Sequence, residues 1–418
     1  MTDLDTPAAR PAAGRTHGVG AAAALRRAAP ALAGYAAVRL LGLVGLAVWA
    51  AARGVDPLVR LTARWDALWY ARIAESGYGY TVRLPDGDVH ADLAFFPLLP
   101  WLERGVAAVS PLSFGEAGLL VSLVASLAAA WGIFAVTDLV LGRRAGVCAA
   151  VLWGALPVGI VQTMAYSESL FTALAAWSLY AVLSGRWALA GSLALAAGLT
   201  RPVGLAVAAA VWAGAVASFV RDRSAAAADG APAGARDLHA VRAGLDVPFG
   251  GANRWTRALG MLLAPLGAAG YVLWVGRRTG EGLFGYLDVQ AGWRNGFDGG
   301  AAFARFVAGL FASLPGALAG LALIAGVGLV GWLLLAGVRA GLPLPLLVYG
   351  SLVTLLAFGA SSYFGSKPRL LVPAFPLLLP VAGAAARARP ALAAALLALA
   401  AAASAVYGGL WLTGSGPP

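Results

Sequence analysis

The sequence predicts an all-α, polytopic membrane protein. Of its 418 residues, 60% are hydrophobic and only 12% are charged, and the mean hydropathy is +0.79. Windows of roughly 17–25 apolar residues are long enough to cross a hydrocarbon core of about 30 Å. About eleven such windows occur, near residues 31–52, 115–141, 145–164, 168–184, 187–200, 203–220, 258–276, 317–338, 343–361, 370–385 and 391–412. The pair at 187–200 and 203–220 is interrupted by Arg201-Pro202, so it predicts either two spans or one broken span.

The basic residues of the short loops indicate how the chain is oriented, because short cytoplasmic loops carry an excess of Lys and Arg. If the predicted spans alternate in direction, the basic clusters all fall on one side, which we assign to the cytoplasm. They comprise Arg10, Arg15, Arg26, Arg27, Arg143, Arg144, Arg186, the loop 221–257, Arg339, Arg387 and Arg389. The formal net charge of +11 then reflects topology, and no nucleic-acid-binding motif accompanies it. Membrane lipids, and no nucleic acid, are the expected partners.

These features predict a disordered cytoplasmic tail over residues 1–30 and a single integral membrane domain over 31–418. Within that domain we expect an outer loop at 54–114, a cytoplasmic linker loop at 221–257 and another outer loop at 277–316. The single cysteine, Cys148, falls within a predicted span, so no disulfide framework is expected. The three histidines lie in different loops, which argues against a histidine metal cluster; they are His17, His90 and His239.

One polar island, from Arg64 to Pro100, follows the first predicted span and interrupts the apolar sequence. A helix is expected over 64–76, with Gly77 as its stop and with two tryptophans on an apolar face that suits the membrane interface. Asp66 lies at the margin of that face. Glu75 lies about 180° round the helix, so Asp66 must act alone or with groups from other segments.

Further along the island, the apolar run AFFPLLP is expected to return toward the bilayer surface and to carry His90 and Asp92 with it. With the N-terminus inside and about eleven spans, most of the unusual polar groups emerge together on the outer side. They are Asp66, Asp92, Glu168, Arg201, Trp293, Lys367 and Arg369. Cations on the side opposite the basic loops favour a bound anion such as a lipid phosphate.

A simpler structural explanation stays open for each of these residues. Asp66 suits a helix N-terminus, where the macrodipole favours a negative charge. Glu168 lies beside serines that could cap a helix, and Arg201 could extend its side chain to the membrane surface. Aromatic residues at membrane interfaces often form a belt, which could account for Trp69, Tyr70 and Trp293.

Five segments together resemble known glycosyltransferases. RWDALWYARIAESGY (64–78), AFFPLLP (94–100), YSESLF (166–171) and LTRPVGL (199–205) resemble, in this order, the PIG-V family, whose eukaryotic members are the second mannosyltransferase of GPI-anchor synthesis. SKPRLLVPAFPL (366–377) is similar to the C-terminal part of multispan (GT-C type) glycosyltransferases that use polyprenyl-phosphate sugars. The resemblance covers the membrane region from about Arg64 to Pro376 and leaves out the tail and the loop 221–257.

The resemblance implies a GT-C-like outer loop after the first helix and a catalytic base at Asp66. It also implies polar site residues near His90 and Asp92, at Tyr166–Glu168 and at Arg201. The chain departs from the family pattern at Trp69, where the family often has His, and at Pro202-Val203-Gly204, where Ser-Asn-Gly is common.

The expected chemistry needs a base for the acceptor hydroxyl and cations for the donor phosphate. Asp66 is the candidate base, and the candidate phosphate ligands are Arg201, Lys367 and Arg369. Candidates for acceptor or sugar binding are Trp69, Tyr70, His90, Asp92, Glu168 and Trp293. A monophosphate held by arginine does not require a divalent metal, so neither a metal nor a cofactor is expected.

The sequence therefore predicts a mannosyltransferase of the cytoplasmic membrane that uses a polyprenyl-phosphate sugar and a lipid or glycan acceptor on the outer face. Another sugar on the same scaffold, such as glucose, galactose or arabinose, is one alternative. A transporter or flippase is another, although these often show two related halves with polar groups near the midplane. A non-catalytic membrane subunit is a third.

Overall fold

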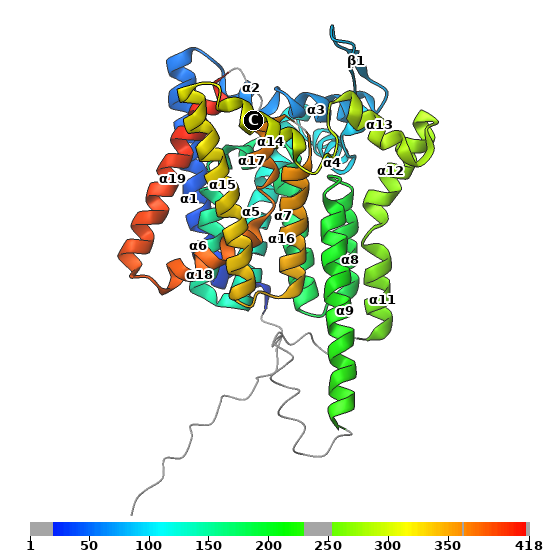
Figure 1. Ribbon diagram of the computed structural model, residues 1–418, viewed down its shortest axis with the longest axis vertical. Helices are drawn as coiled ribbons and strands as arrows, with labels where there is room; N and C mark the ends of the chain where they lie inside the picture. Colours follow the sequence, from blue (N-terminus) through cyan, green and yellow to red (C-terminus); the bar gives the residue numbers. More distant parts are fainter. Residues whose placement is uncertain (1–19, 230–252, 362, 415–418) are drawn as a thin grey trace, which may run out of the picture.

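The computed structural model describes residues 20–229, 253–361 and 363–414 as a bundle of roughly parallel and antiparallel helices (Figure 1). The all-α membrane fold expected from the sequence is confirmed, and each of the predicted apolar windows contains a helix. The bundle helices are α1 (Ala21–Arg53), α5 (Phe114–Leu141), α6 (Arg143–Gly154), α7 (Ser167–Leu183), α8 (Trp187–Gly198), α9 (Gly204–Asp229), α11 (Arg254–Leu263), α12 (Leu266–Thr279), α15 (Leu314–Arg339), α16 (Leu344–Gly359), α18 (Leu379–Arg387) and α19 (Pro390–Leu412).

Shorter elements gather at the upper end of the bundle in Figure 1. They are α2 (Pro57–Thr62), α3 (Asp66–Ser76), β1 (Thr81–Arg83), β2 (Val89–Ala91), η1 (Asp92–Ala94), α4 (Leu98–Ala107), η4 (Gly282–Phe284), α13 (Gly285–Gly292), α14 (Ala301–Leu310), η5 (Phe364–Ser366) and α17 (Lys367–Leu370). The strands pair antiparallel as a hairpin, with Val82 opposite His90. We call this end of the molecule the site end, because the predicted functional residues lie there.

Within the described residues, six helical segments are long and apolar enough to cross a membrane, with α11 and α12 taken together as one. A seventh is added if the bent pair 364–370 and 375–387 is a single span. The remaining windows hold shorter apolar helices, so the count of about eleven spans stays a prediction. Two windows contain breaks that matter for the site. The window 145–164 divides into α6 and the short η2 (Gly159–Thr163). The helical segments 364–370 and 375–387, the second beginning with η6 (Phe375–Leu378), are bent by 74°.

Small residues allow the helices to approach closely, as is common where helices pack in a membrane. At Gly267 on α12, an added Cβ would lie 1.9 Å from the Leu195 carbonyl oxygen of α8. At Gly191 on α8, it would lie 2.4 Å from the Gly260 carbonyl oxygen of α11. The group α8, α11 and α12 is therefore held backbone to backbone, at the right of Figure 1.

Several predicted boundaries differ from the structure. Residues 21–30, assigned to a disordered tail, form the first turns of α1, because the Ala-rich run is a good helix former. There Arg27 pairs with Asp138 of α5 at 2.5 Å; residues 1–19 lie outside the described part. The helix expected over 64–76 begins at Asp66 and ends before Gly77, as predicted. The linker loop 221–257 is shortened by α9 and α11, and residues 230–252 lie outside the described part.

Of the arginines assigned to the cytoplasm, Arg27, Arg143 and Arg144 lie together at the end of the bundle opposite the site. Arg144 donates to the Ala388 carbonyl at 2.7 Å, and Arg143 donates to the Arg27 carbonyl at 3.4 Å. These contacts join the start of α1, the α5–α6 turn and the α18–α19 turn into one basic surface. It follows that the basic loops and the candidate site lie at different ends of the bundle.

This arrangement predicts sidedness. In a Cys148→Ser background, Val109→Cys at the site end should react with an impermeant thiol reagent from outside, and Arg144→Cys should react only after the membrane is opened. Val109 is 87% exposed, so its access is not limited by packing. Labelling of both positions from the same side would contradict the predicted topology.

Candidate active site

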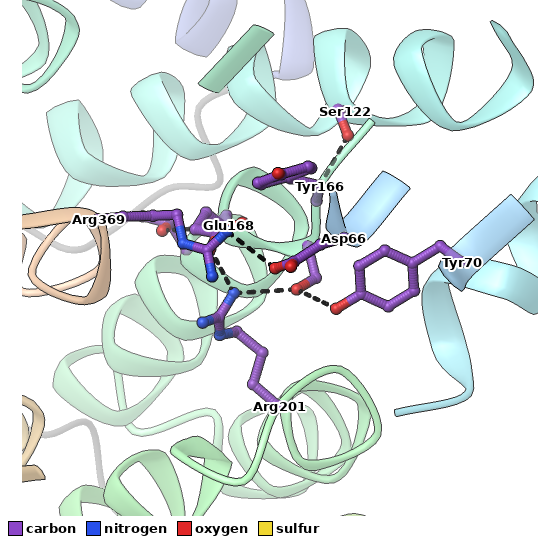
Figure 2. A network of polar contacts seen from close by, with 9 residues as sticks. Asp66, Tyr70, Ser122, Tyr166, Glu168, Arg201 and Arg369 are labelled. Carbon is purple, nitrogen blue, oxygen red and sulfur yellow. Dashed lines mark hydrogen bonds and ion pairs between the residues drawn. The ribbon is translucent and has the colours of Figure 1, made fainter. Parts of the chain in front are cut away.

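Asp66 is the first residue of α3 and lies at a sharp turn of the chain. The preceding residue, Trp65, has a φ of 51°, which is strained for a residue with a side chain. Strain of this kind persists only where the surrounding structure holds it, and it is frequent at functional sites. The Asp66 carboxylate faces Arg369 of α17, and Oδ2 lies 2.8 Å from a guanidinium nitrogen (Figure 2).

Glu168, in the first turn of α7, lies between two arginines. One carboxylate oxygen is 2.6 Å from Arg201 and 3.3 Å from Arg369. Arg201 follows α8 in the break before α9, and the neighbouring Leu199 carbonyl accepts a hydrogen bond from the Leu98 N–H of α4 at 2.9 Å. The three charged side chains thus come from three segments that are far apart in sequence. Together with Asp66 they form one ion-pair cluster.

Neighbouring polar and aromatic side chains contact this cluster. The Ser167 hydroxyl accepts a hydrogen bond from Arg201 at 3.0 Å and lies 2.9 Å from the Tyr70 hydroxyl (Figure 2). Burial raises the pKa of the Tyr70 hydroxyl, so it stays protonated and available as a donor. On the other side, the Arg369 guanidinium lies 5.1 Å from the Tyr166 ring centroid, and the Tyr166 carbonyl accepts from Ser122 at 2.9 Å.

The four charged side chains of the cluster differ in their exposure to solvent. The Glu168 side chain is 1% exposed, Arg369 is 11%, Arg201 is 15% and Asp66 is 27%. Two carboxylates face two guanidinium groups, so the cluster carries no net charge and no member is a buried charge without a counter-ion. Asp66 is therefore the member of the cluster that a reactant reaches most easily, and Glu168 is the member that holds the others.

An aromatic cluster lies next to the ion pairs. Trp69 stacks on Phe95 at 5.6 Å and meets Trp293 edge-on at 4.9 Å. The His90 ring stacks on Trp293 at 3.9 Å, and Tyr80 completes the group at 5.6 Å from Trp69. Phe95 also contacts the Tyr70 ring edge-on at 5.2 Å, which joins the aromatic cluster to the ion-pair cluster.

Trp293 is fixed by the hairpin β1–β2. Its indole N–H donates to the Ala91 carbonyl at 3.0 Å. The next residue, Arg294, has a φ of 56° and forms ion pairs with Asp86, at 2.7 Å, and with Asp88. The hairpin tip thus holds the segment that brings Trp293 over His90.

Several candidates have contacts other than those expected. Asp92 is 1% exposed, and its Oδ2 accepts from the N–H groups of Gly79 and Tyr80, each at 2.8 Å, so it holds the loop after α3. The Lys367 ammonium donates to the carbonyls of Ala357 and Ala360, at 2.9 and 2.6 Å, at the end of α16. These contacts occupy Lys367 away from the ion-pair cluster.

Tyr70 and Glu168, two of the candidates for acceptor or sugar binding, are buried in the structure: Tyr70 is 5% exposed and Glu168 is fully buried. Both support the charged cluster. The sequence analysis missed Tyr80 and Phe95 as members of the aromatic cluster, and it included Ser167 only through the resemblance, within Tyr166–Glu168. The aromatic density around the island was a signal for Tyr80 and Phe95, whereas nothing in the sequence connects Ser167 to Tyr70. Within the described residues, no group of three or more His, Cys, Asp or Glu could hold a metal ion.

Comparisons with known proteins give distant structural likenesses. No family model and no curated protein matches the chain. ArnT from Cupriavidus metallidurans, in a crystal structure with undecaprenyl phosphate, matches 84% of this chain at 17% identity with a TM-score of 0.48. The archaeal oligosaccharyltransferase AglB from Archaeoglobus fulgidus, in complex with an inhibitory peptide and a dolichol-phosphate, matches 92% at 13% identity with a TM-score of 0.45. The chain spans about 60% of the length of the ArnT structure and 56% of that AglB structure.

The position of Glu168 predicts a large effect on stability. Glu168→Gln leaves Arg201 and Arg369 with less compensating charge, and breaking a buried ion pair in this way costs about 3–5 kcal/mol. We expect a clear fall in the thermal unfolding temperature in detergent. Glu75→Gln, at an exposed position of α3, is the matched control and should leave that temperature unchanged. Equal unfolding temperatures for the two variants would contradict a structural role for Glu168.

Proposed function

We propose that this protein is a membrane glycosyltransferase that transfers a sugar from a polyprenyl-phosphate donor to a hydroxyl group of a lipid or glycan acceptor. The observation that carries the proposal is the ion-pair cluster, in which a partly exposed carboxylate, Asp66, shares a guanidinium with the buried carboxylate Glu168. A base and two cations within one cluster are the groups that this reaction needs.

The proposed reaction is a displacement at the anomeric carbon of the donor sugar. The acceptor oxygen forms a bond to that carbon while the bond from the carbon to the phosphate oxygen breaks. The acceptor proton passes to the Asp66 carboxylate, and polyprenyl phosphate leaves with the electron pair of the broken bond. Asp66 suits the role of base because it is the most exposed group of the cluster.

Arg201 and Arg369 are the proposed ligands of the donor phosphate. As the sugar–phosphate bond breaks, negative charge on the phosphate grows, and fixed guanidinium groups stabilise it. Glu168 holds both arginines in place, so little reorganisation is required at that moment. When Asp66 takes the proton, its charge is neutralised and its hold on Arg369 weakens, which leaves that guanidinium free to serve the departing phosphate. Lys367 is not part of this proposal, because backbone carbonyls occupy its ammonium.

The aromatic cluster is the proposed surface for the sugar or the acceptor. Trp69, Trp293 and His90 are each partly exposed, whereas Tyr70 and Phe95 beneath them are buried. A sugar placed against these rings lies beside Tyr70, whose hydroxyl touches Ser167 of the ion-pair cluster. Asp92 supports the same surface through the loop that carries Tyr80.

Mannose as the transferred sugar is proposed from the resemblance of RWDALWYARIAESGY and its companion segments to the PIG-V family, and a site on the outer face of the membrane is proposed from the basic residues of the short loops. A direct test supplies purified protein in liposomes with polyprenyl-phosphate mannose, glucose, galactose or arabinose and a panel of acceptor lipids and peptides. Transfer from polyprenyl-phosphate mannose alone supports a mannosyltransferase. Transfer from another of these donors supports a glycosyltransferase that uses a different sugar. Movement of the donor across the liposome membrane without transfer would favour a flippase.

Asp66→Asn is expected to lower turnover by roughly 10²–10⁴-fold, because the amide keeps the size of the side chain but cannot accept the proton. Donor affinity should not fall, because the base acts on the acceptor and loss of the Asp66 charge leaves Arg369 free for the donor phosphate. The measurements are single-turnover transfer and equilibrium binding of the donor to the same preparation. Turnover close to that of the unmodified protein would move the base to another residue.

Arg201→Ala is expected to weaken donor binding and to slow the chemical step together, because Arg201 interacts with a phosphate whose charge grows in the transition state. Arg201→Lys should restore binding only in part, because a point charge cannot reproduce the planar donor array of a guanidinium. Donor dissociation constants for both variants check this. Affinities equal to that of the unmodified protein in both would remove Arg201 from the donor site.

A further inference from the structure

Two broken membrane segments bring the charged residues of the site together. The first break lies between α6 and α7 and ends before Ser167, so Glu168 is the second residue of α7. The second lies between the helical segments 364–370 and 375–387, which are bent by 74°, and Arg369 lies in α17 just before it. A broken helix frees backbone groups that must find other partners, because lipid offers none. The side chains that bond to those backbone groups therefore fix the path of the chain at each break.

Residues of α1 hold the first break. The Arg39 guanidinium is buried in the bundle and donates to the carbonyls of Gly154 and Gly159, on either side of the interruption. The Tyr35 hydroxyl donates to the Gln162 side-chain oxygen at 3.0 Å. A cation inside a membrane-spanning helix is costly without partners. Here two carbonyls at the ends of the break accept hydrogen bonds from the two terminal nitrogens of Arg39.

Gln162 connects the break to both of its flanking helices. Its side-chain nitrogen donates to the Trp153 carbonyl of α6 at 2.7 Å. Its own backbone carbonyl accepts from the Ser169 hydroxyl of α7 at 3.0 Å, one residue after Glu168. Gln162 is fully buried, so these bonds form a closed link from α6 to the start of α7.

Trp153 joins the first break to the second. Its indole N–H donates to the Val372 carbonyl at 2.9 Å, three residues after Arg369. The ring is fully buried and stacks on Tyr35 at 5.3 Å with an interplanar angle of 20°. Trp153 thus contacts both segments. Its backbone carbonyl bonds to Gln162 in the segment that leads to Glu168, and its ring nitrogen bonds to Val372 in the segment that follows Arg369.

We propose that Trp153 is a positioning residue for the transfer reaction, and that its indole N–H sets the placement of Arg369 relative to Glu168. This inference rests on the proposed function, in which Arg369 serves the donor phosphate. The Arg369–Glu168 contact depends on two segments that lie next to separate breaks. The Trp153 bond to Val372 directly joins those two segments beneath the site, and a shift of the second break moves Arg369 away from the cluster.

Trp153→Phe tests the proposal, because phenylalanine keeps an apolar ring against Tyr35 but removes the N–H that Val372 accepts. The expected result is a fall in the single-turnover rate of sugar transfer of about 10- to 10²-fold, the size of effect that a displacement of about 1 Å produces. Trp212→Phe is the matched control. It removes an indole N–H bond to a backbone carbonyl, that of Met261 at 2.8 Å, in the helix group α9 and α11.

A double-mutant cycle separates positioning from a general loss of stability. If Trp153 acts through Arg369, Trp153→Phe should add little to the rate loss already caused by Arg369→Lys, whereas effects of independent residues add. Additive rate losses, or a rate for Trp153→Phe equal to that of Trp212→Phe, would overturn the proposal. If Arg369→Lys alone leaves the rate and donor affinity unchanged, the proposed role of Arg369 fails instead.

Tyr35→Phe keeps the test decisive if Trp153→Phe does not fold. It retains the ring that stacks on Trp153 and removes only the hydroxyl that donates to Gln162. We expect a smaller loss of rate that is likewise non-additive with Arg369→Lys. An additive loss in this variant would overturn the proposal in the same way.

Discussion

The interaction on which the site depends is the contact of the buried Glu168 carboxylate with Arg201 and Arg369. A charge in the interior of a membrane protein is costly, and the cost is recovered only when partners are close and well placed. Distances of 2.6 and 3.3 Å place both guanidinium groups close to one oxygen of this carboxylate. Because Arg369 also reaches Asp66, the same contact fixes the one carboxylate of the cluster that remains partly exposed.

The helix breaks follow from this requirement. α6 ends at Gly154, and after the short η2 a new helix starts at Ser167, one residue before Glu168. The backbone groups freed by the break bond to Arg39 and to Gln162, and the Leu156 carbonyl accepts from Ser404 of α19 at 2.6 Å. Polar residues inside the bundle thus hold the break that precedes Glu168, and the charged residues form the cluster at the end of the bundle.

Residues close in sequence take different roles here because their surroundings differ. Lys367 and Arg369 lie two positions apart on α17, yet the lysine closes the end of α16 and the arginine enters the ion-pair cluster. His90 and Asp92 show the same division. The imidazole stacks on Trp293 in the aromatic cluster, whereas the carboxylate accepts backbone N–H groups of the loop that follows α3.

The sequence by itself determined the all-α membrane class, the positions of the apolar windows and the gathering of unusual polar residues at one end, because long apolar runs and the alternation of spans are local properties of the chain. It also singled out Asp66, Glu168, Arg201 and Arg369. Only the tertiary structure decided that these four touch, that Lys367 and Asp92 bond to backbone instead, and that Ser167 links Tyr70 to Arg201. Most of those outcomes depend on distances between segments that are far apart in the sequence, and no local pattern encodes such distances.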